Sequence, residues 1–265
     1  PGDYIGKEVV AEELKVLDLI SNKHGFVLKK TFYPHGGEHY LRTGEVLPDS
    51  IIRELKEYHA IVFGAVGGHS GIPVGLIEKG LLLKMRFDLD QYINLRPAKL
   101  YAGVDAALRL LHPNLPDGYE LIVVREGVGD LYTGQGGITI NEKGQKVATQ
   151  IMEYTDFQVE RTVRYALDLS RKKGKETGSK PWPVVLGFKS NVLEYVSREL
   201  WEPIFFSIAK SEYPDLPAAY AHIDALNGPN LITQIKPTSW IIVTGNMFGD
   251  IITDPITSLF GGMGV

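Results

Sequence analysis

The spacing of apolar residues alternates between a helical and an extended period along the first third of the chain. An amphipathic helix is predicted over residues 10–20, and Gly25 follows it as a C-terminal cap. Further helices are predicted over 50–58, with Asp49 or Ser50 as N-cap, and over roughly 76–92. Short apolar runs predict two strands, at 26–32 and 60–65.

The rest of the chain repeats this alternation. Thr155 and Gln158 form a capping box, which predicts that a helix starts there. Residues 138–140 and 146–154 flank a turn at Lys143-Gly144 and predict a hairpin, and 174–183 predicts a loop. Further predicted strands are 121–124, 184–188, 218–223 and 241–244, and further predicted helices are 191–210 and one starting near 246. Alternating strands and helices indicate an α/β protein with parallel or mixed sheets covered by helices.

Composition excludes several classes of protein. The 265 residues are 44% hydrophobic and 23% charged, which argues against a disordered chain. A net charge of −4 gives no general attraction for nucleic acid or an anionic membrane, and no apolar run is long enough to span one. The chain has no cysteine, so any metal must be held by oxygen or imidazole. No signal peptide is visible, and both ends are expected to be cut from a longer protein.

Three aspartates are the candidate metal ligands. Asp250 and Asp254 lie four residues apart on a predicted helix, so their carboxylates share one face. Asp224 follows a predicted strand, where α/β proteins place ligand sites. Carboxylate oxygens suit Mg²⁺ or Mn²⁺. The alternative is that these are solvated surface acids, favoured near a helix N-terminus by its dipole.

Basic and phenolic side chains supply the other candidate chemistry. Arg86, Arg96 and Arg125 can bind carboxylates in a bidentate manner and together predict a di- or tricarboxylate ligand. Lys189 ends a buried strand and is a candidate base, and Tyr132 is a candidate proton donor. Each of these could equally be an ordinary surface or packing residue. The seven histidines show no paired metal spacing and are assigned no role.

Five segments, spread from end to end of the chain, resemble the β-decarboxylating dehydrogenases, the family that acts on isopropylmalate, isocitrate, homoisocitrate, tartrate and D-malate. The resemblance implies a two-domain isopropylmalate/isocitrate dehydrogenase-like α/β fold with mixed sheets flanked by helices. It implies a first domain over 1–91, completed by residues beyond 265, and a second over 92–260 that carries a dimer arm at about 133–154. The segments are 2–9, 81–97, 124–126, 189–194 and 246–254.

Within the family the isopropylmalate branch is the most similar. The stretch 78–86 resembles the substrate-recognition helix of that branch, in which Leu82 and Leu83 would form an apolar slot for the isopropyl group. A leucine patch cannot satisfy the extra carboxylate of isocitrate. Asp90-Gln91 resembles the tartrate/D-malate branch instead, which is the alternative substrate assignment.

The resemblance implies a role for each candidate residue in an NAD-dependent oxidative decarboxylation of leucine biosynthesis. Arg86, Arg96 and Arg125 would hold the substrate with Glu78, Leu82, Leu83 and Asp224, and Asp224, Asp250 and Asp254 would hold Mg²⁺ or Mn²⁺. Lys189 and Tyr132 would move protons, and Asn191 and Glu78 would contact NAD. Asp224 would come from the second subunit of a homodimer. The expected location is the cytoplasm, or an organelle if a transit segment was removed.

Several departures from the family pattern favour a different alternative. Tyr4 replaces a glycine of the family motif. Pro203 and Pro255 each lie within a predicted helix, and Pro255 directly follows a proposed metal ligand. Gly228 and Pro229 stand where the family starts a helix. The family's adenosine-binding segment would lie beyond residue 265. These features leave open a non-catalytic paralogue or regulatory subunit of the same fold.

Overall fold

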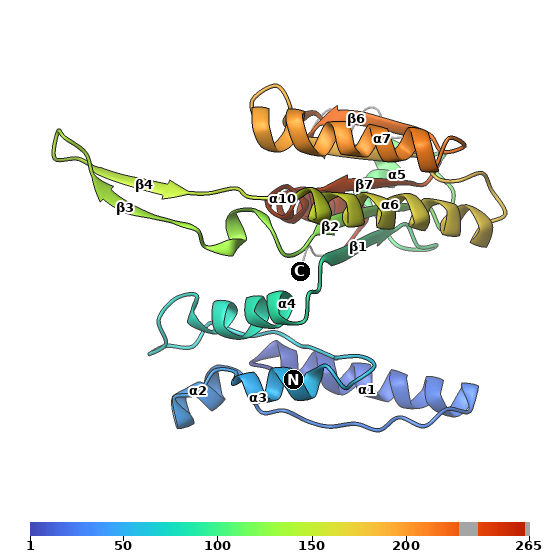
Figure 1. Cartoon of the computed structure of the whole chain (residues 1–265). Coiled ribbons are helices and arrows are strands. Elements are labelled where there is room, and N and C mark those ends of the chain that lie inside the picture. The colour runs from blue at the N-terminus through green and yellow to red at the C-terminus, as the bar shows by residue number, and fades with distance from the viewer. Residues whose placement is uncertain (228–237, 263–265) are drawn as a thin grey trace. The chain divides into compact units, whose positions relative to one another are not determined.

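In the computed structural model, which describes residues 1–227 and 238–262, the chain divides into two units, Pro1–Gln91 and Tyr92–Val265. The second unit is built on a five-stranded sheet with the strand order β1-β2-β7-β5-β6 (Figure 1). The edge strand β1 runs antiparallel to β2, and the other described pairs are parallel. The sheet is therefore mixed, as the sequence predicts. Its strands are β1 (Ile93–Lys99), β2 (Glu120–Glu126), β5 (Val184–Phe188), β6 (Ala218–His222) and β7 (Trp240–Thr244).

Alternate residues of the central strands face opposite layers of helices. In β2, Ile122 and Val124 pack with α6 (Asp156–Glu176) and α7 (Glu202–Glu212). Their neighbours Leu121 and Val123 pack on the opposite face. That face is covered by α5 (Ala107–Leu111), α8 (Ile223–Asn227) and α10 (Asn246–Leu259). Because side chains alternate along a strand, a continuous apolar run is buried on both faces.

Helix boundaries in this unit follow local capping chemistry. The predicted capping box forms: the Thr155 hydroxyl accepts from the backbone N–H of Gln158, whose side chain accepts from the N–H of Thr155. The predicted loop at 174–183 starts later, because α6 continues to Glu176. The predicted helix 191–210 divides into a π-helix, η3 (Glu194–Trp201), and α7, and Pro203 lies in the first turn of α7, where its missing N–H costs nothing.

The predicted hairpin forms from β3 (Gly136–Ile140) and β4 (Lys146–Gln150), although its second strand ends earlier than expected. The carboxamide oxygen of Asn141 accepts the backbone N–H groups of Lys143 and Gln145 and fixes the turn. Every residue of both strands is exposed, and the ribbon projects from the body of its unit (Figure 1). A two-stranded ribbon has little stability by itself.

The first unit is mainly helical. Its helix α1 (Ile5–His24) ends at Gly25, whose left-handed backbone (φ 72°) confirms the predicted cap. The short α3 starts one residue after Pro48, which takes the N-cap position instead of Asp49 or Ser50. The other helices are α2 (Gly37–Thr43), α3 (Asp49–Leu55), the π-helix η1 (Glu78–Leu83) and α4 (Lys84–Asp88). The core of the unit comprises Leu47, Ile52, Leu55, Ile77, Leu81 and Met85.

Two predictions for the first unit are wrong. The segments 26–32 and 60–65 are not strands, and an isolated bridge between Gly2 and Ala65 is the one ladder contact described for this unit. Both segments line an apolar cavity of about 460 Å³ instead of pairing with each other. An apolar run becomes a strand only when another strand satisfies its backbone groups. The predicted helix 76–92 is also shorter, because it ends at Asp88.

No helix in the described part of the chain has the length and apolar character needed to cross a membrane.

Candidate functional site

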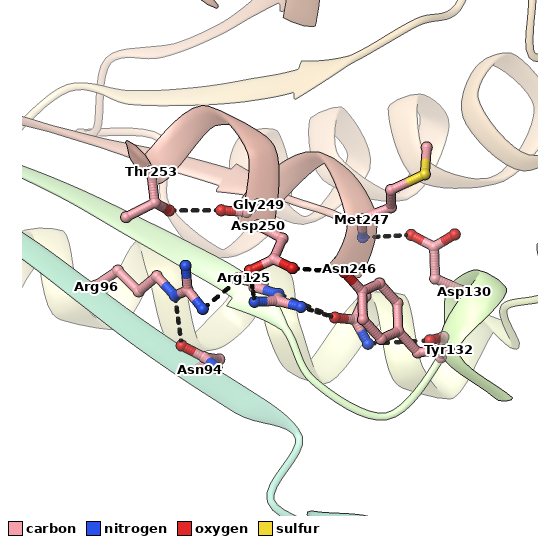
Figure 2. Close-up of polar contacts among 11 residues, drawn as sticks. Asn94, Arg96, Arg125, Asp130, Tyr132, Asn246, Met247, Gly249, Asp250 and Thr253 are labelled. Carbon is pink, nitrogen blue, oxygen red and sulfur yellow. Dashed lines mark hydrogen bonds and ion pairs between the residues drawn. The ribbon is translucent and has the colours of Figure 1, made fainter. Parts of the chain in front are cut away.

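Three predicted site residues of the second unit converge on the carboxylate of a fourth, Asp250 (Figure 2). Arg96 reaches it from β1 at 3.1 Å and Arg125 from β2 at 2.5 Å, both at the same oxygen, Oδ1. The hydroxyl of Tyr132, on the 3₁₀ turn η2 (Asp130–Thr133), donates to Oδ2 at 2.6 Å. The antiparallel pairing of β1 and β2 and the packing of α10 on β2 bring these residues together. We call Arg96, Arg125, Tyr132 and Asp250 the Asp250 cluster.

Arg125 is the most constrained member of this cluster. It is 1% exposed, and its Nε and Nη2 both donate to the side-chain oxygen of Asn246, at 2.9 and 2.7 Å. Gly249 lets α10 approach closely, since a Cβ at that position would lie 2.6 Å from Cγ of Arg125. The guanidinium direction is therefore fixed by the fold before any ligand binds.

The electrostatics of the cluster keep Asp250 ionised and Tyr132 protonated at neutral pH. Partial burial raises the pKa of Asp250, but the Tyr132 hydroxyl and the guanidinium groups of Arg125 and Arg96 outweigh it and lower the pKa below its usual range. Burial and the neighbouring Asp250 carboxylate raise the pKa of Tyr132. Two cations face one anion, so the cluster carries excess positive charge that suits a carboxylate ligand.

A second charged pair lies elsewhere in the same unit. Lys189, directly after β5, forms an ion pair with Asp224 at 2.7 Å. Asp224 was predicted to follow directly on a strand, but it lies in the first turn of α8, because β6 ends at His222. Its side chain is 64% exposed, and the hydrogen bond from Lys189 lowers its pKa. Neither member forms a hydrogen bond or ion pair with Asp250.

Asp254 and Asp250 provide oxygen donors on one face of α10. Asp254 is exposed one turn after Asp250, and the helix continues to Leu259 although Pro255 lies inside it. Ionised oxygen donors fit a hard divalent cation such as Mg²⁺. Asp224 does not join them: among the described residues the one group of three close metal-ligand side chains is His35, His39 and Glu45.

The remaining predicted residues lie at the surface of their elements. In η1 and α4, Leu81 and Met85 face the core of the first unit, whereas Leu82, Leu83 and Arg86 are half-buried. Glu78 begins η1 and is half-buried too. Asn191 is exposed after β5.

The structure adds residues that the sequence analysis missed. Asp130 adopts a left-handed backbone (φ 73°) that non-glycine residues rarely tolerate. Its buried carboxylate accepts from the backbone N–H of Met247 and from the hydroxyl of Tyr154, and that hydroxyl accepts from the N–H of Asn246. This network fixes the start of α10 and thereby Asp250. The sequence shows neither the backbone conformation nor the burial of Asp130; the one local signal was an acid directly after Gly129.

Comparison with known proteins gives consistent matches over the whole chain. The family model described as isocitrate/isopropylmalate dehydrogenase matches residues 1–265. A 3-isopropylmalate dehydrogenase of Thermobifida fusca is 40% identical over 265 residues, covering 100% of this chain and 71% of the relative. One of Nocardia farcinica is 41% identical over 100% of this chain and 73% of the relative. The crystal structure of isocitrate dehydrogenase from Methylococcus capsulatus superposes with a TM-score of 0.78 at 27% identity, over 99% of this chain and 70% of that one.

Proposed function

Because the chain belongs to the isocitrate/isopropylmalate dehydrogenase family, we propose that it oxidises and decarboxylates 3-isopropylmalate to 2-oxoisocaproate in leucine biosynthesis. The electron acceptor is NAD⁺, and the proposed location is the cytoplasm. The observation that carries the proposal is the Asp250 cluster, in which two arginines and a protonated tyrosine surround an ionised carboxylate. These are the groups that a metal-assisted decarboxylation of a hydroxy acid requires.

In this proposal the arginines bind the substrate carboxylates. Arg96 is the more exposed partner, with 28% of its side chain accessible, and Arg125 is held by Asn246. Arg86 is proposed as a third guanidinium that binds the substrate. Leu82 and Leu83, which do not belong to the core of that unit, provide apolar surface for the isopropyl group. An isopropyl group prefers such a surface, and a carboxylate does not.

Mg²⁺ or Mn²⁺ would be held by Asp250, Asp254 and Asp224 of the partner subunit. When bound, such an ion acidifies the substrate hydroxyl and stabilises negative charge on the adjacent oxygen. Asp250 is suited to this role because its lowered pKa keeps it ionised and its carboxylate remains 40% exposed. Asp254 offers a second oxygen donor one turn away on α10.

Proton transfers are assigned to Lys189 and Tyr132. Lys189 of the partner subunit takes part in removing the hydroxyl proton as the substrate loses its hydride to NAD⁺. Tyr132 donates a proton to the enol carbon after CO₂ has left, which its raised pKa favours by keeping the hydroxyl protonated. Asn191 and Glu78 contact the cofactor.

This assignment requires a homodimer, since Lys189 and Asp224 form no hydrogen bond or ion pair with Asp250 within one chain. The exposed β3–β4 hairpin is the proposed dimer arm. Its outward apolar side chains Ile138 and Ile140 are 72% and 63% exposed, and pairing with a second copy would cover them. Ile138→Lys should therefore give a monomer by light scattering that is folded by circular dichroism and forms no NADH.

The substrate assignment is tested by measuring NADH formation from 3-isopropylmalate, D-malate, tartrate and isocitrate with Mg²⁺ present. The expected result is the highest kcat/KM with 3-isopropylmalate. Faster turnover of D-malate or tartrate would move the protein to the alternative branch that Asp90-Gln91 resembles. No turnover of any acid by the protein as a dimer would favour the non-catalytic paralogue.

A further inference from the structure

Two histidines and a glutamate of the first unit form a cluster that the proposed function does not use. His35 precedes α2, His39 lies within it and Glu45 follows it. One ligand atom from each of the three lies within 4.8 Å of the other two. Glu45 Oε1 is 3.8 Å from Nε2 of His35 and 3.6 Å from Nε2 of His39. We call these residues the His35 cluster.

These separations are close to those of a bound metal. Ligand atoms at Zn–N and Zn–O distances near 2.0–2.1 Å in a tetrahedron lie about 3.4 Å apart. The two distances to Glu45 therefore need to contract by only a few tenths of an ångström, and the three ligand atoms all lie within 4.8 Å of one another. Glu45 has a 52% exposed side chain and can make this adjustment.

Each of the two largely buried histidines has one ring nitrogen without a hydrogen-bond partner. Their side chains are 9% and 11% exposed. Nδ1 of His35 and Nε2 of His39 are inaccessible to solvent and accept or donate no hydrogen bond within the described residues. Buried polar atoms are nearly always paired. Nε2 of His39 is both unsatisfied and 3.6 Å from the Glu45 carboxylate, so this atom points to a missing partner within the cluster.

The two imidazole rings lie beside each other, with ring centroids 4.9 Å apart. A transition metal binds neutral imidazole nitrogens, which leaves the single carboxylate of Glu45 as the one anionic ligand of the site. Arg42 contacts Nδ1 of His39 at 3.4 Å, the outer limit of a hydrogen bond, and its exposed side chain can turn away from a bound cation.

We propose that His35, His39 and Glu45 form a site for a borderline divalent transition metal of the Zn²⁺ class, separate from the aspartates that hold Mg²⁺ or Mn²⁺. Two imidazoles and one carboxylate select Zn²⁺ or a similar ion over Mg²⁺, which prefers oxygen ligands alone. Three protein ligands leave one coordination position for water. Because the ligands lie before, within and after α2, the ion ties both ends of this seven-residue helix together.

The test is titration of the full protein with Co²⁺, followed by its visible absorption, and with Zn²⁺, followed by metal analysis after dialysis. Excess Mg²⁺ is present throughout to occupy the carboxylate site. The expected result is stoichiometric Zn²⁺ retention, an intense tetrahedral Co²⁺ spectrum that Zn²⁺ abolishes, and a higher melting temperature with Zn²⁺.

Three variants identify the ligands. Glu45→Gln removes an exposed ligand and should fold normally. His39→Gln removes a buried ligand. Each variant should weaken Co²⁺ binding about a hundredfold or more. His59→Gln removes an exposed histidine outside the cluster and should leave binding unchanged. Equal loss in all three variants, or no Zn²⁺ retention by the wild-type protein, would overturn the proposal. These readouts do not use turnover, so they are independent of the proposed dehydrogenase activity.

Discussion

The two charged regions of the second unit are built in opposite ways. The Asp250 cluster draws residues from β1, β2, η2 and α10, and its central Arg125 is buried and held by Asn246. The Lys189–Asp224 pair is one ion pair between partly exposed side chains. The first region cannot form unless the sheet and α10 are in place, whereas the second depends on little besides its own two residues.

This difference allows effects on stability to be told apart from effects on turnover. A buried charge that loses its partner costs several kcal/mol, whereas an exposed ion pair contributes about 0–1 kcal/mol. Substitutions in the Asp250 cluster should therefore reduce both stability and turnover. Substitutions in the Lys189–Asp224 pair should reduce turnover alone, because that pair has its proposed role only when it meets a second subunit.

Arg125→Gln should have the largest effect. It removes one of the two cations beside Asp250 and leaves the buried side-chain oxygen of Asn246 without the two N–H donors of Arg125. We expect a loss of about 3 kcal/mol in the free energy of unfolding and no measurable turnover. Urea denaturation followed by circular dichroism measures the first quantity.

A matched arginine provides the control for this variant. Arg164 also pairs with two acceptors, Glu160 and Glu212, but at the surface of the same unit. Arg164→Gln should cost less than about 1 kcal/mol. If the two variants were equally stable, burial would not be what distinguishes the Asp250 cluster.

Lys189→Met should abolish turnover without unfolding the protein. Loss of a general base lowers kcat by about a thousandfold, while the melting temperature should stay within about 2 °C because the lysine forms one exposed ion pair. Lys189→Arg keeps the positive charge beside Asp224 but not a group that accepts a proton. Recovered activity in Lys189→Arg would show that the lysine positions Asp224 and is not the base.

The same contrast between buried and exposed regions explains which strands and helices could be predicted from the sequence. Strands β2, β5 and β7 were predicted because they are apolar on both faces, and α6 because its cap is local. The edge strand β1 was missed, since Arg96 and Pro97 interrupt its pattern; an edge strand tolerates proline because one side of it needs no ladder bond. The strands predicted in the first unit failed because pairing is not a local property.

For the site, residue type was predictable and connectivity was not. The types of Arg96, Arg125, Tyr132 and Asp250 identified them as candidates, and the structure brings these four together. The bonds from Arg125 to Asn246 span 121 residues, and no local pattern encodes them. The sequence analysis found no paired metal spacing among the histidines, although His35 and His39 lie four residues apart. The third member of the His35 cluster, Glu45, follows α2, a helix that the sequence did not predict.

Tyr132→Phe should have an intermediate effect. We expect kcat to fall about a hundredfold if the hydroxyl is the proton donor. The variant also removes the hydrogen bond that helps lower the pKa of Asp250. A carboxyl group whose pKa is lower in the folded state stabilises the fold at pH values above its unfolded pKa, and this stabilisation is lost as the pH falls through the folded pKa. The variant raises the folded pKa of Asp250, so the stabilisation is lost at a higher pH. The acid limbs of kcat/KM and of the melting temperature should both move upward in pH. A lower kcat with unmoved acid limbs would mean that Tyr132 does not influence Asp250.

Gly249→Ala should have the smallest effect, and it tests whether the Asp250 cluster depends on close packing as well as charge. The added methyl group would lie 2.6–2.7 Å from Cγ and Cβ of Arg125, which are near the backbone and cannot swing away, so α10 must shift. Such overpacking costs about 2 kcal/mol, a fall in the melting temperature of roughly 4–8 °C.

Gly137→Ala in β3 is the control, because its methyl group would meet nothing within 4 Å and should change the melting temperature little. If KM for the substrate rises in Gly249→Ala and not in Gly137→Ala, displacement of the Arg125 guanidinium is the cause, since no charge has been removed. Equal melting temperatures for the two variants would contradict the close approach of α10 to β2 on which the geometry of the cluster depends.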